Sequence, residues 1–255
     1  MNFLFLGGQM SKEELYKKFA KYYDKIYSKK DYIGECQFIE WAVAQHKTSA
    51  GKKLLDVACG TGAHADLLKK NFSILGVDIS SDMLDIAREK VPDVEFKEGD
   101  MKKLDLKGKF DVITCLFSAM NYNTSLKEYE LTLKNFYEHL HPGGVLIFDL
   151  GINHENWMEG MISVDTVVED NLKLARICQS HLEGNIFNAD FVFLVKENEK
   201  LDFDIDRHII GVFKTSEIFE LMKKVGFYVA VYGEFTHKKW EKGSMERPVF
   251  VGLKQ

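Results

Sequence analysis

The segment from Leu54 to Ala63 constrains this chain most, because an apolar run stops there at a glycine turn that opens a helical pattern. Such a strand, glycine turn and helix are typical of doubly wound α/β folds. Asp56 interrupts the apolar run, and a carboxylate at the end of a buried strand is costly unless a cation or hydrogen-bond donors meet it. The turn therefore suits a ligand that carries both a carboxylate and an amino group better than it suits a pyrophosphate.

A dinucleotide is the rival ligand for this turn. Residues 60–65 also fit the G-x-G-x-x-G/A fingerprint, and Asp78 follows about 20 residues later, where a ribose-binding acid is expected. The motif alone leaves a dinucleotide and an amino-acid-bearing ligand such as S-adenosylmethionine both open. The rest of the chain has to decide between them.

Short apolar runs alternate with helical patterns along the first part of the chain. Helices are predicted near residues 63–70, 82–90 and 125–140, the last with Ser125 and Glu128 as a capping box. This alternation predicts a parallel, doubly wound sheet in an α/β fold. Its strands are expected at residues 53–57, 74–77, 94–97, 110–116 and 145–148.

The pattern changes after residue 150 to charged and apolar residues in alternation, without helical periodicity. This pattern predicts antiparallel strands with one wet face, lying as an inserted sheet over the parallel core. A final helix is expected at 215–225, and the last two strands are expected to form an antiparallel edge. The inserted strands are predicted at 162–168, 172–182, 185–195 and 203–212, and the closing pair at 227–232 and 249–252.

Charge and cysteine usage limit the partners and the compartment. The chain of 255 residues has a net charge of −5, so electrostatics gives no support for nucleic acid as a partner. A lysine cluster at residues 17–30, interleaved with tyrosines, is expected to be a solvated helix face. The four cysteines lack metal-ligand spacing and are expected to be reduced thiols of a cytoplasmic protein; they are Cys36, Cys59, Cys115 and Cys178.

The apolar start of the chain, residues 1–6, is short and has no basic flank. It is therefore predicted to be neither a signal peptide nor a membrane span. The first nine residues are interpreted as a disordered extension.

Three predicted strands end in acidic residues, and this set favours S-adenosylmethionine over a dinucleotide. Asp56 lies in the first strand, Asp78 can accept both ribose hydroxyls at the end of the second, and Asp100 can take an adenine amino group at the third. A dinucleotide needs neither Asp56 nor Asp100. The loop at 116–122 carries aromatic residues above the expected reacting centre.

With these motifs, residues 16–150 resemble the class I S-adenosylmethionine-dependent methyltransferases, whose sheet has seven strands with the last antiparallel. A more specific resemblance is to the sugar-nucleotide N,N-dimethyltransferases of deoxyaminosugar biosynthesis. The matching segments are 23–27, 31–32, 55–64, 99–101, 117–122 and 247–252, whereas the insert matches only loosely. The resemblance implies an N-terminal helical lid (1–50), a methyltransferase core (51–150 and 214–255) and an acceptor wall (151–213).

The same resemblance implies roles for individual residues. Tyr27 and Tyr122 are the expected catalytic residues, Asn121 and Arg247 are expected to contact the acceptor, and no metal is expected. The expected cofactor residues are Tyr32, Asp56, Ala58, Cys59, Gly60, Gly62, His64, Asp78, Ile79, Met83, Asp100, Met101, Leu116 and Phe117.

The expected function is in-line methyl transfer from S-adenosylmethionine to a small molecule, with an amine nitrogen as the favoured acceptor. An NAD-dependent oxidoreductase and a non-catalytic S-adenosylmethionine-binding protein are the alternatives. The expected partners exclude nucleic acid and membranes, and the chain is expected to be a monomer or a homodimer.

Overall fold

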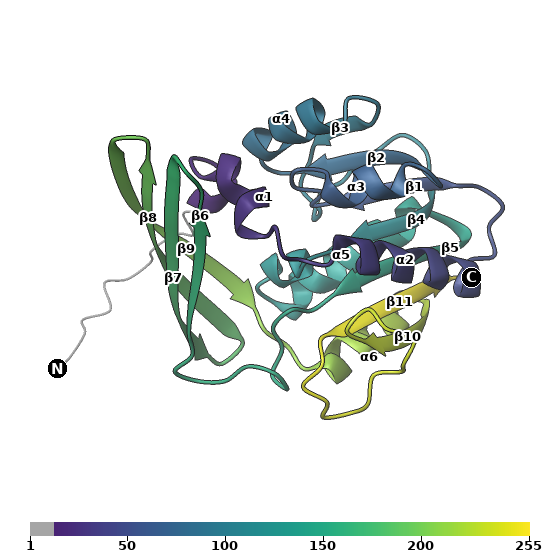
Figure 1. Ribbon diagram of the computed structural model, residues 1–255. Coiled ribbons are helices and arrows are strands. Elements are labelled where there is room, and N and C mark those ends of the chain that lie inside the picture. The colour runs from purple at the N-terminus through teal and green to yellow at the C-terminus, as the bar shows by residue number, and fades with distance from the viewer. Residues whose placement is uncertain (1–12) are drawn as a thin grey trace.

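A seven-stranded sheet with helices on both faces forms the core of the computed structural model, which describes residues 13–255 (Figure 1). The expectations for the first nine residues fall outside the described part of the chain. The strand order is β10-β11-β5-β4-β1-β2-β3. The strands are β1 (Lys53–Val57), β2 (Ser73–Asp78), β3 (Glu95–Glu98), β4 (Phe110–Cys115), β5 (Leu140–Asp149), β10 (Phe227–Gly233) and β11 (Pro248–Lys254).

The last strand, β11, is antiparallel to both of its neighbours, β5 and β10, and the strands from β5 to β3 pair in parallel. The predicted seven-stranded, doubly wound α/β sheet with its last strand antiparallel is therefore confirmed. The closing pair forms an antiparallel edge, as expected, with β10 outermost and β11 between β10 and β5.

Alternate residues of the strands supply the two layers of the core, as a side-chain period of two requires. Leu54 faces the helices on one side, and Leu55 faces those on the other. Helices α2, α3 and α4 cover the first face, and α5 and α6 cover the second. The helices are α1 (Tyr23–Ile26), α2 (Tyr32–His46), α3 (Ala63–Leu68), α4 (Ser81–Lys90), α5 (Leu126–His139) and α6 (Thr215–Val225), with 3-10 turns η1 (Glu14–Tyr16), η2 (Ala20–Tyr22) and η3 (Ala119–Tyr122).

The start of α5 differs in one detail from the predicted capping box. Ser125 Oγ accepts a hydrogen bond from the backbone N–H of Glu128, as expected. The carboxylate of Glu128, however, accepts from the backbone N–H and the hydroxyl of Thr124 rather than from Ser125. Glu128 therefore binds Thr124, the residue before the N-cap Ser125, and α5 still begins at the predicted position.

The inserted strands form a separate four-stranded antiparallel sheet, as predicted, but it does not lie over the core sheet. It stands beside the core, and η1, η2 and α1 pack on it (Figure 1). Phe19 stacks on Phe193 of the insert with 4.5 Å between ring centroids. The strands are β6 (Ile162–Val168), β7 (Leu172–Glu183), β8 (Ile186–Glu197) and β9 (Lys200–Gly211).

The expected N-terminal lid divides into two parts with different packing. Residues 13–31 lie between the two sheets, whereas α2 packs on the core sheet through fully buried side chains such as Ile39. α2 is therefore a layer of the core rather than part of a lid. A lid can consist only of the segment before it, which we call the N-terminal segment (residues 13–31).

Most lysines of the N-terminal segment are exposed, as expected for a solvated face, but three of them also pair with the insert. Lys18, Lys21 and Lys25 pair with carboxylates of the insert. Each exposed pair stabilises the fold by about 1 kcal/mol or less, so the pairs add to the buried apolar contacts that hold the segment on the insert. Their partners are Asp202 and Asp204, Glu197, and Glu169.

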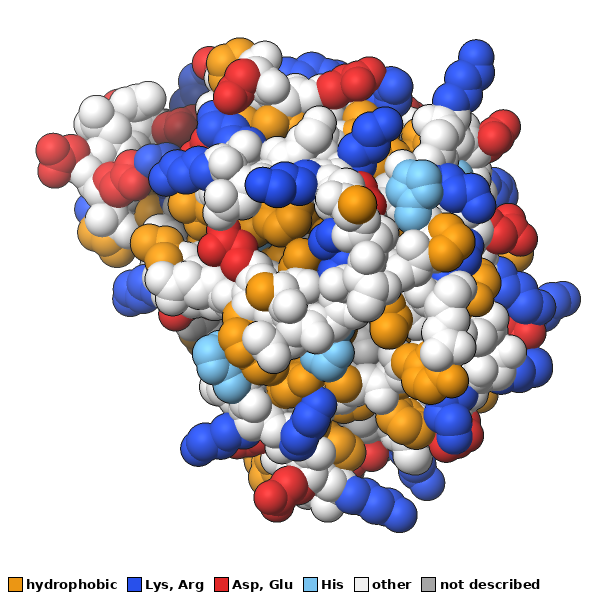
Figure 2. All heavy atoms as spheres, turned by 90° about the vertical axis from the view of Figure 1, so that its right-hand side faces the viewer, with side chains coloured by type: hydrophobic (Ala, Val, Ile, Leu, Met, Phe, Trp, Pro, Cys, Tyr) orange, Lys and Arg blue, Asp and Glu red, His pale blue; other side chains and the backbone are white. Residues whose placement is uncertain are grey.

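Basic and acidic side chains are interspersed on the face shown in Figure 2, without a gathered patch of either sign. No helix within residues 13–255 is long and apolar enough to cross a membrane.

Candidate functional site

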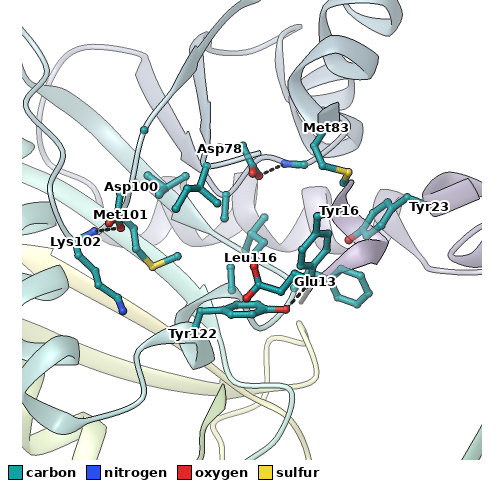
Figure 3. A pocket seen from close by; sticks show the side chains of 17 residues that line it. Glu13, Tyr16, Tyr23, Asp78, Met83, Asp100, Met101, Lys102, Leu116 and Tyr122 are labelled. Carbon is teal, nitrogen blue, oxygen red and sulfur yellow. Dashed lines mark hydrogen bonds between the residues drawn. The ribbon is translucent and has the colours of Figure 1, made fainter. Parts of the chain in front are cut away.

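A cavity opens where the strands β1, β2, β3 and β4 end, and the N-terminal segment and η3 close it (Figure 3). Many of the predicted site residues line it. They are Ala58, Gly60, Asp78, Ile79, Met83, Asp100, Met101, Leu116, Phe117 and Tyr122. The remaining lining residues were not predicted; they are Glu13, Tyr16, Tyr23, Val57, Gly99, Lys102 and Ala119.

Asp78 ends β2 and is the most constrained carboxylate on the cavity wall. Its two oxygens accept hydrogen bonds from the backbone N–H groups of Gly60 (2.8 Å) and Ser80 (2.9 Å), and the residue is only 8% exposed. Burial raises the pKa of Asp78 despite these hydrogen bonds. Each oxygen keeps a further lone pair, so the carboxylate can still accept from two adjacent hydroxyl groups.

Asp100 and Met101 form another part of the wall, beyond the end of β3. Asp100 Oδ1 accepts a hydrogen bond of 2.9 Å from the backbone N–H of Lys102, which fixes the turn. The thioether of Met101 and the side chains of Ile79 and Leu116 make the wall between Asp78 and Asp100 largely apolar. A flat heterocycle with one polar edge fits such a wall.

Asp56 lies in β1 behind the cavity wall and does not line the cavity. One of its oxygens accepts a hydrogen bond of 2.8 Å from the Thr114 hydroxyl. The other is buried and has no partner within residues 13–255. Burial raises the pKa of Asp56, and the open oxygen is a place for an ammonium group or a water to donate a hydrogen bond. Cys59 and Gly62, also predicted, belong to the turn that follows but not to the cavity lining.

A second cluster of charged side chains centres on Glu35 of α2. Its carboxylate accepts from Lys30 and, at 2.8 Å, from His64. Burial alone would raise the pKa of Glu35, but the hydrogen bonds from His64 and Lys30 lower it. Arg247 lies 3.8 Å from Glu35 and 3.7 Å from Asp149, beyond direct hydrogen-bonding distance.

The predicted residues Tyr32, His64 and Arg247 thus belong to this cluster and not to the cavity lining. The Tyr32 ring packs against His64 with 5.1 Å between centroids. Asp149, next to Arg247, accepts a hydrogen bond from the backbone N–H of Ser118, which directly follows Phe117 of the cavity wall. The cluster therefore adjoins the cavity on the side of Phe117.

Tyr27 and Asn121 are held by contacts with the insert. Arg176 donates a hydrogen bond of 2.8 Å to the Tyr27 hydroxyl, and the Tyr27 ring packs edge-on against Phe117. Asn121 is buried and donates to the backbone carbonyls of Ile152 and Gly211. Neither side chain lines the cavity, so both are one layer behind its wall.

Sequence reasoning missed Tyr16 and Tyr23 because they belong to a segment interpreted as a surface. Both side chains instead face the cavity, and the Tyr16 hydroxyl lies 2.9 Å from that of Tyr122 (Figure 3). Tyr16 ends η1 and Tyr23 begins α1, so no single helix relates the two side chains and their spacing could not have shown that they share one side. The N-terminal segment therefore contributes a group of tyrosines to the site.

Residues 13–255 contain no group of three or more His, Cys, Asp or Glu side chains placed to hold a metal ion. All four cysteines are unpaired and buried.

Comparisons with known proteins agree on one family. Residues 54–144 match the family model described as a methyltransferase domain. The chain is 33% identical over 238 residues to dTDP-3-amino-3,4,6-trideoxy-alpha-D-glucopyranose N,N-dimethyltransferase of Streptomyces venezuelae, covering 92% of this chain and 97% of the relative.

Two solved structures share the whole architecture. DesVI of Streptomyces venezuelae superposes with a TM-score of 0.80 at 30% identity, covering 93% of this chain and 98% of its own. The amino pentose methyltransferase CalS10 of Micromonospora echinaspora, solved with S-adenosylmethionine bound, gives a TM-score of 0.77 at 25% identity over the full length of both chains.

Proposed function

The chain belongs to the class I S-adenosylmethionine-dependent methyltransferases, and we propose that it methylates an amine nitrogen of a small molecule, with a deoxyaminosugar nucleotide as the first acceptor to test. The relatives are methyltransferases, so the dinucleotide alternative is not favoured. The observation that carries the acceptor proposal is the tyrosine-lined end of the cavity, formed by Tyr16, Tyr23 and Tyr122. The relative in Streptomyces venezuelae, an N,N-dimethyltransferase of an aminosugar nucleotide, supports the same class of acceptor.

The residues of the cavity fit S-adenosylmethionine. Asp78 would accept the two ribose hydroxyls, and Asp100 with the backbone of Met101 would hold the adenine. The unpartnered oxygen of Asp56, buried beside Val57 of the wall, would take the ammonium of the methionine end. These assignments give one polar group each to the ribose, the adenine and the ammonium of the cofactor.

When bound, S-adenosylmethionine supplies a methyl group that is already activated by its positive sulfur. The protein's contribution is therefore alignment and exclusion of water. Aromatic faces and tyrosine oxygens favour positive charge nearby, and Tyr16, Tyr23 and Phe117 place such groups on the cavity wall. An amine must also lose its proton before it can react, and the hydroxyl of Tyr122 is one of the polar groups at that end of the cavity.

The experiment that tests this function uses the S-adenosylhomocysteine formed as its readout. We expect turnover with dTDP-3-amino-3,4,6-trideoxy-alpha-D-glucopyranose and a gain of one or two methyl groups by mass spectrometry. Binding of S-adenosylmethionine without turnover on this sugar or on a panel of small amines would support the non-catalytic alternative. Turnover only on hydroxyl or carboxylate acceptors would contradict the amine.

Arg247 gives a prediction for the acceptor. Its guanidinium is 28% exposed and lies beyond hydrogen-bonding distance of its two carboxylate neighbours, so its N–H groups can turn toward a diphosphate. Arg247→Ala should raise KM for the sugar nucleotide about ten- to a hundredfold, the loss of one charge-assisted hydrogen bond. The kcat should change less, as measured by steady-state kinetics.

Lys242→Ala is the matched control for that prediction, because it removes one positive charge from an exposed position of the same β10–β11 connection. Equal KM values for the two variants would show that Arg247 does not contact the acceptor. A KM increase that is also seen with an uncharged amine acceptor would exclude the diphosphate as its partner.

The N-terminal segment, residues 13–31, is proposed to be the lid. The Ser80 hydroxyl donates to the backbone carbonyl of Tyr16, and the Thr61 hydroxyl donates to Asp24, so the segment is joined to both cofactor loops. Amide hydrogen exchange in the segment should slow when S-adenosylhomocysteine binds, while exchange in α2 stays constant. Equal exchange with and without ligand would make the segment a fixed part of the fold.

We also infer that the enzyme works in a reducing compartment such as the cytoplasm. The support for this is that all four cysteines are unpaired and buried.

A further inference from the structure

A chain of hydrogen bonds leads from the tyrosine end of the cavity into the inserted sheet. The hydroxyls of Tyr16 and Tyr122 lie 2.9 Å apart (Figure 3), and the Tyr122 hydroxyl lies 2.5 Å from Nδ1 of His208. The other ring nitrogen of His208 lies 2.8 Å from Oδ2 of Asp206. The cavity is thus connected to an imidazole and a carboxylate that do not line it.

Chemistry fixes the direction of these hydrogen bonds. The Asp206 carboxylate can only accept, so the neutral His208 ring carries its proton on Nε2 and offers a lone pair at Nδ1. Tyr122 must then donate its single proton to Nδ1. Its own oxygen is left as an acceptor that faces Tyr16 and the cavity.

Asp206 is held firmly in the ionised form. It is 0% exposed, and its carboxylate also accepts hydrogen bonds from the backbone N–H groups of Glu14 (2.7 Å) and Leu15 (3.1 Å). Burial alone would raise the pKa of Asp206, but the hydrogen bonds from His208, Glu14 and Leu15 lower it. A fixed negative charge therefore lies behind the imidazole.

His208 is enclosed by groups from several elements. The rings of Tyr16 and Phe191 meet its ring edge-on, at 5.4 and 5.3 Å between centroids, and the residue is 6% exposed. The titratable groups around the His208–Tyr122 pair are Asp206, on the same strand as His208; Tyr16 and Glu13, at η1; and Tyr27, directly after α1. Among these groups, Asp206 is the carboxylate that contacts the imidazole directly.

We propose that His208, a positioning residue that acts through Tyr122, takes up the proton that an ammonium acceptor must lose, and that Asp206 sets its tautomer. This inference rests on the amine acceptor proposed above. It gives the His and Asp of the insert a role in the reaction, beyond forming a wall.

The step moves one proton over two hydrogen bonds. The ammonium N–H bond breaks, and its proton passes to the Tyr122 oxygen while the Tyr122 proton passes to Nδ1 of His208. The nitrogen keeps the electron pair, and the imidazole becomes an imidazolium whose charge Asp206 compensates. After product release the same hydrogen bonds return the proton to water in the cavity.

Tyr122 alone could not do this. Burial, reinforced by the neighbouring Tyr16, raises the pKa of Tyr122, so its phenolate is not a stable form. The phenol can accept a proton only if it passes its own proton on in the same event. The imidazole is the group in position to receive it.

The test is the pH dependence of kcat with dTDP-3-amino-3,4,6-trideoxy-alpha-D-glucopyranose. His208→Asn keeps an acceptor near the Nδ1 position but cannot take up a proton. At neutral pH the variant should be about a hundredfold slower, the lower end of the range for general-base catalysis. It should recover toward the wild-type rate as the pH approaches the pKa of the free amine, where no proton needs to be removed.

The matched control is His181→Asn, the same substitution at an exposed position of β7 in the same sheet, which should leave the profile unchanged. Tyr122→Phe should show the same pH dependence of kcat as His208→Asn. It serves as the test variant if His208→Asn does not fold. A loss that is equal at every pH, or no loss, would overturn the proposal. If the wild type has no turnover on the sugar, the acceptor assignment fails instead.

A second readout needs neither acceptor nor turnover. In nitrogen NMR of the protein saturated with S-adenosylhomocysteine, we expect the His208 ring, identified by its absence in His208→Asn, to carry hydrogen on Nε2 only. A ring protonated at Nδ1 instead would mean that Tyr122 cannot donate to it, and the proton route would be excluded.

Discussion

Replacing Asp78 by alanine should lower the affinity for S-adenosylmethionine at least tenfold while the fold persists. Asp78 is the acidic residue at the end of β2 on the cavity wall, and its oxygens keep lone pairs beyond those used by Gly60 and Ser80. Hydrogen bonds to a charged acceptor contribute about 1.5–3 kcal/mol each. Losing one such bond already accounts for about a tenfold change, and losing two gives about a hundredfold or more.

Isothermal titration with S-adenosylhomocysteine is the appropriate measurement, with thermal unfolding of the ligand-free variants beside it. Asp78→Asn keeps the shape and one acceptor oxygen, so its loss of affinity should be smaller than that of the alanine variant. Asp82→Ala, at an exposed position in the first turn of α4, is the control. Unchanged affinity in Asp78→Ala would remove Asp78 from the cofactor site.

The cofactor side of the cavity could be predicted from the sequence because it is encoded locally. Gly60, Asp78 and Asp100 each lie at or just beyond the end of a strand of a parallel sheet, and those ends meet at one edge of any such sheet. Once the strands are recognised, no further information is needed to predict that the side chains at their ends lie close together. This is why these predicted residues line the cavity.

The acceptor side could not be predicted in this way, because it depends on how distant segments dock. Nothing in the sequence near Tyr16 states that it meets Tyr122, 106 positions later. The N-terminal segment docks on the insert through buried side chains such as Leu15 and Phe19, and exposed ion pairs of its lysines add to this contact.

His208 illustrates a signal that was present but not used. Asp206 and His208 are two positions apart in a predicted strand, so they had to share one face. Where such a face is buried, the carboxylate can accept a hydrogen bond from the histidine and so fix the orientation of its ring. Which face of the insert is buried is decided by the docking of the N-terminal segment.

Gly62 should tolerate even a methyl group poorly, and Gly62→Ala should destabilise the protein by about 2–5 kcal/mol. The residue begins α3 with φ +75, a left-handed conformation that costs other residues about 1–2 kcal/mol. A Cβ there would lie 3.1 Å from the Phe96 ring and 3.4 Å from Cβ of Ala87. Both neighbours are buried, so overpacking adds about 1–3 kcal/mol.

Gly108→Ala separates the two causes. Gly108 is also left-handed, with φ +98, but an added Cβ meets nothing within 4 Å. It should therefore show the backbone cost alone, about 1–2 kcal/mol. Urea unfolding of the ligand-free proteins measures the difference, and equal losses of stability in the two variants would mean that Phe96 moves aside without cost.

Gly62 also shapes the turn that places the Gly60 N–H on Asp78. Gly62→Ala should therefore lose affinity for S-adenosylhomocysteine, whereas Gly108→Ala should keep it.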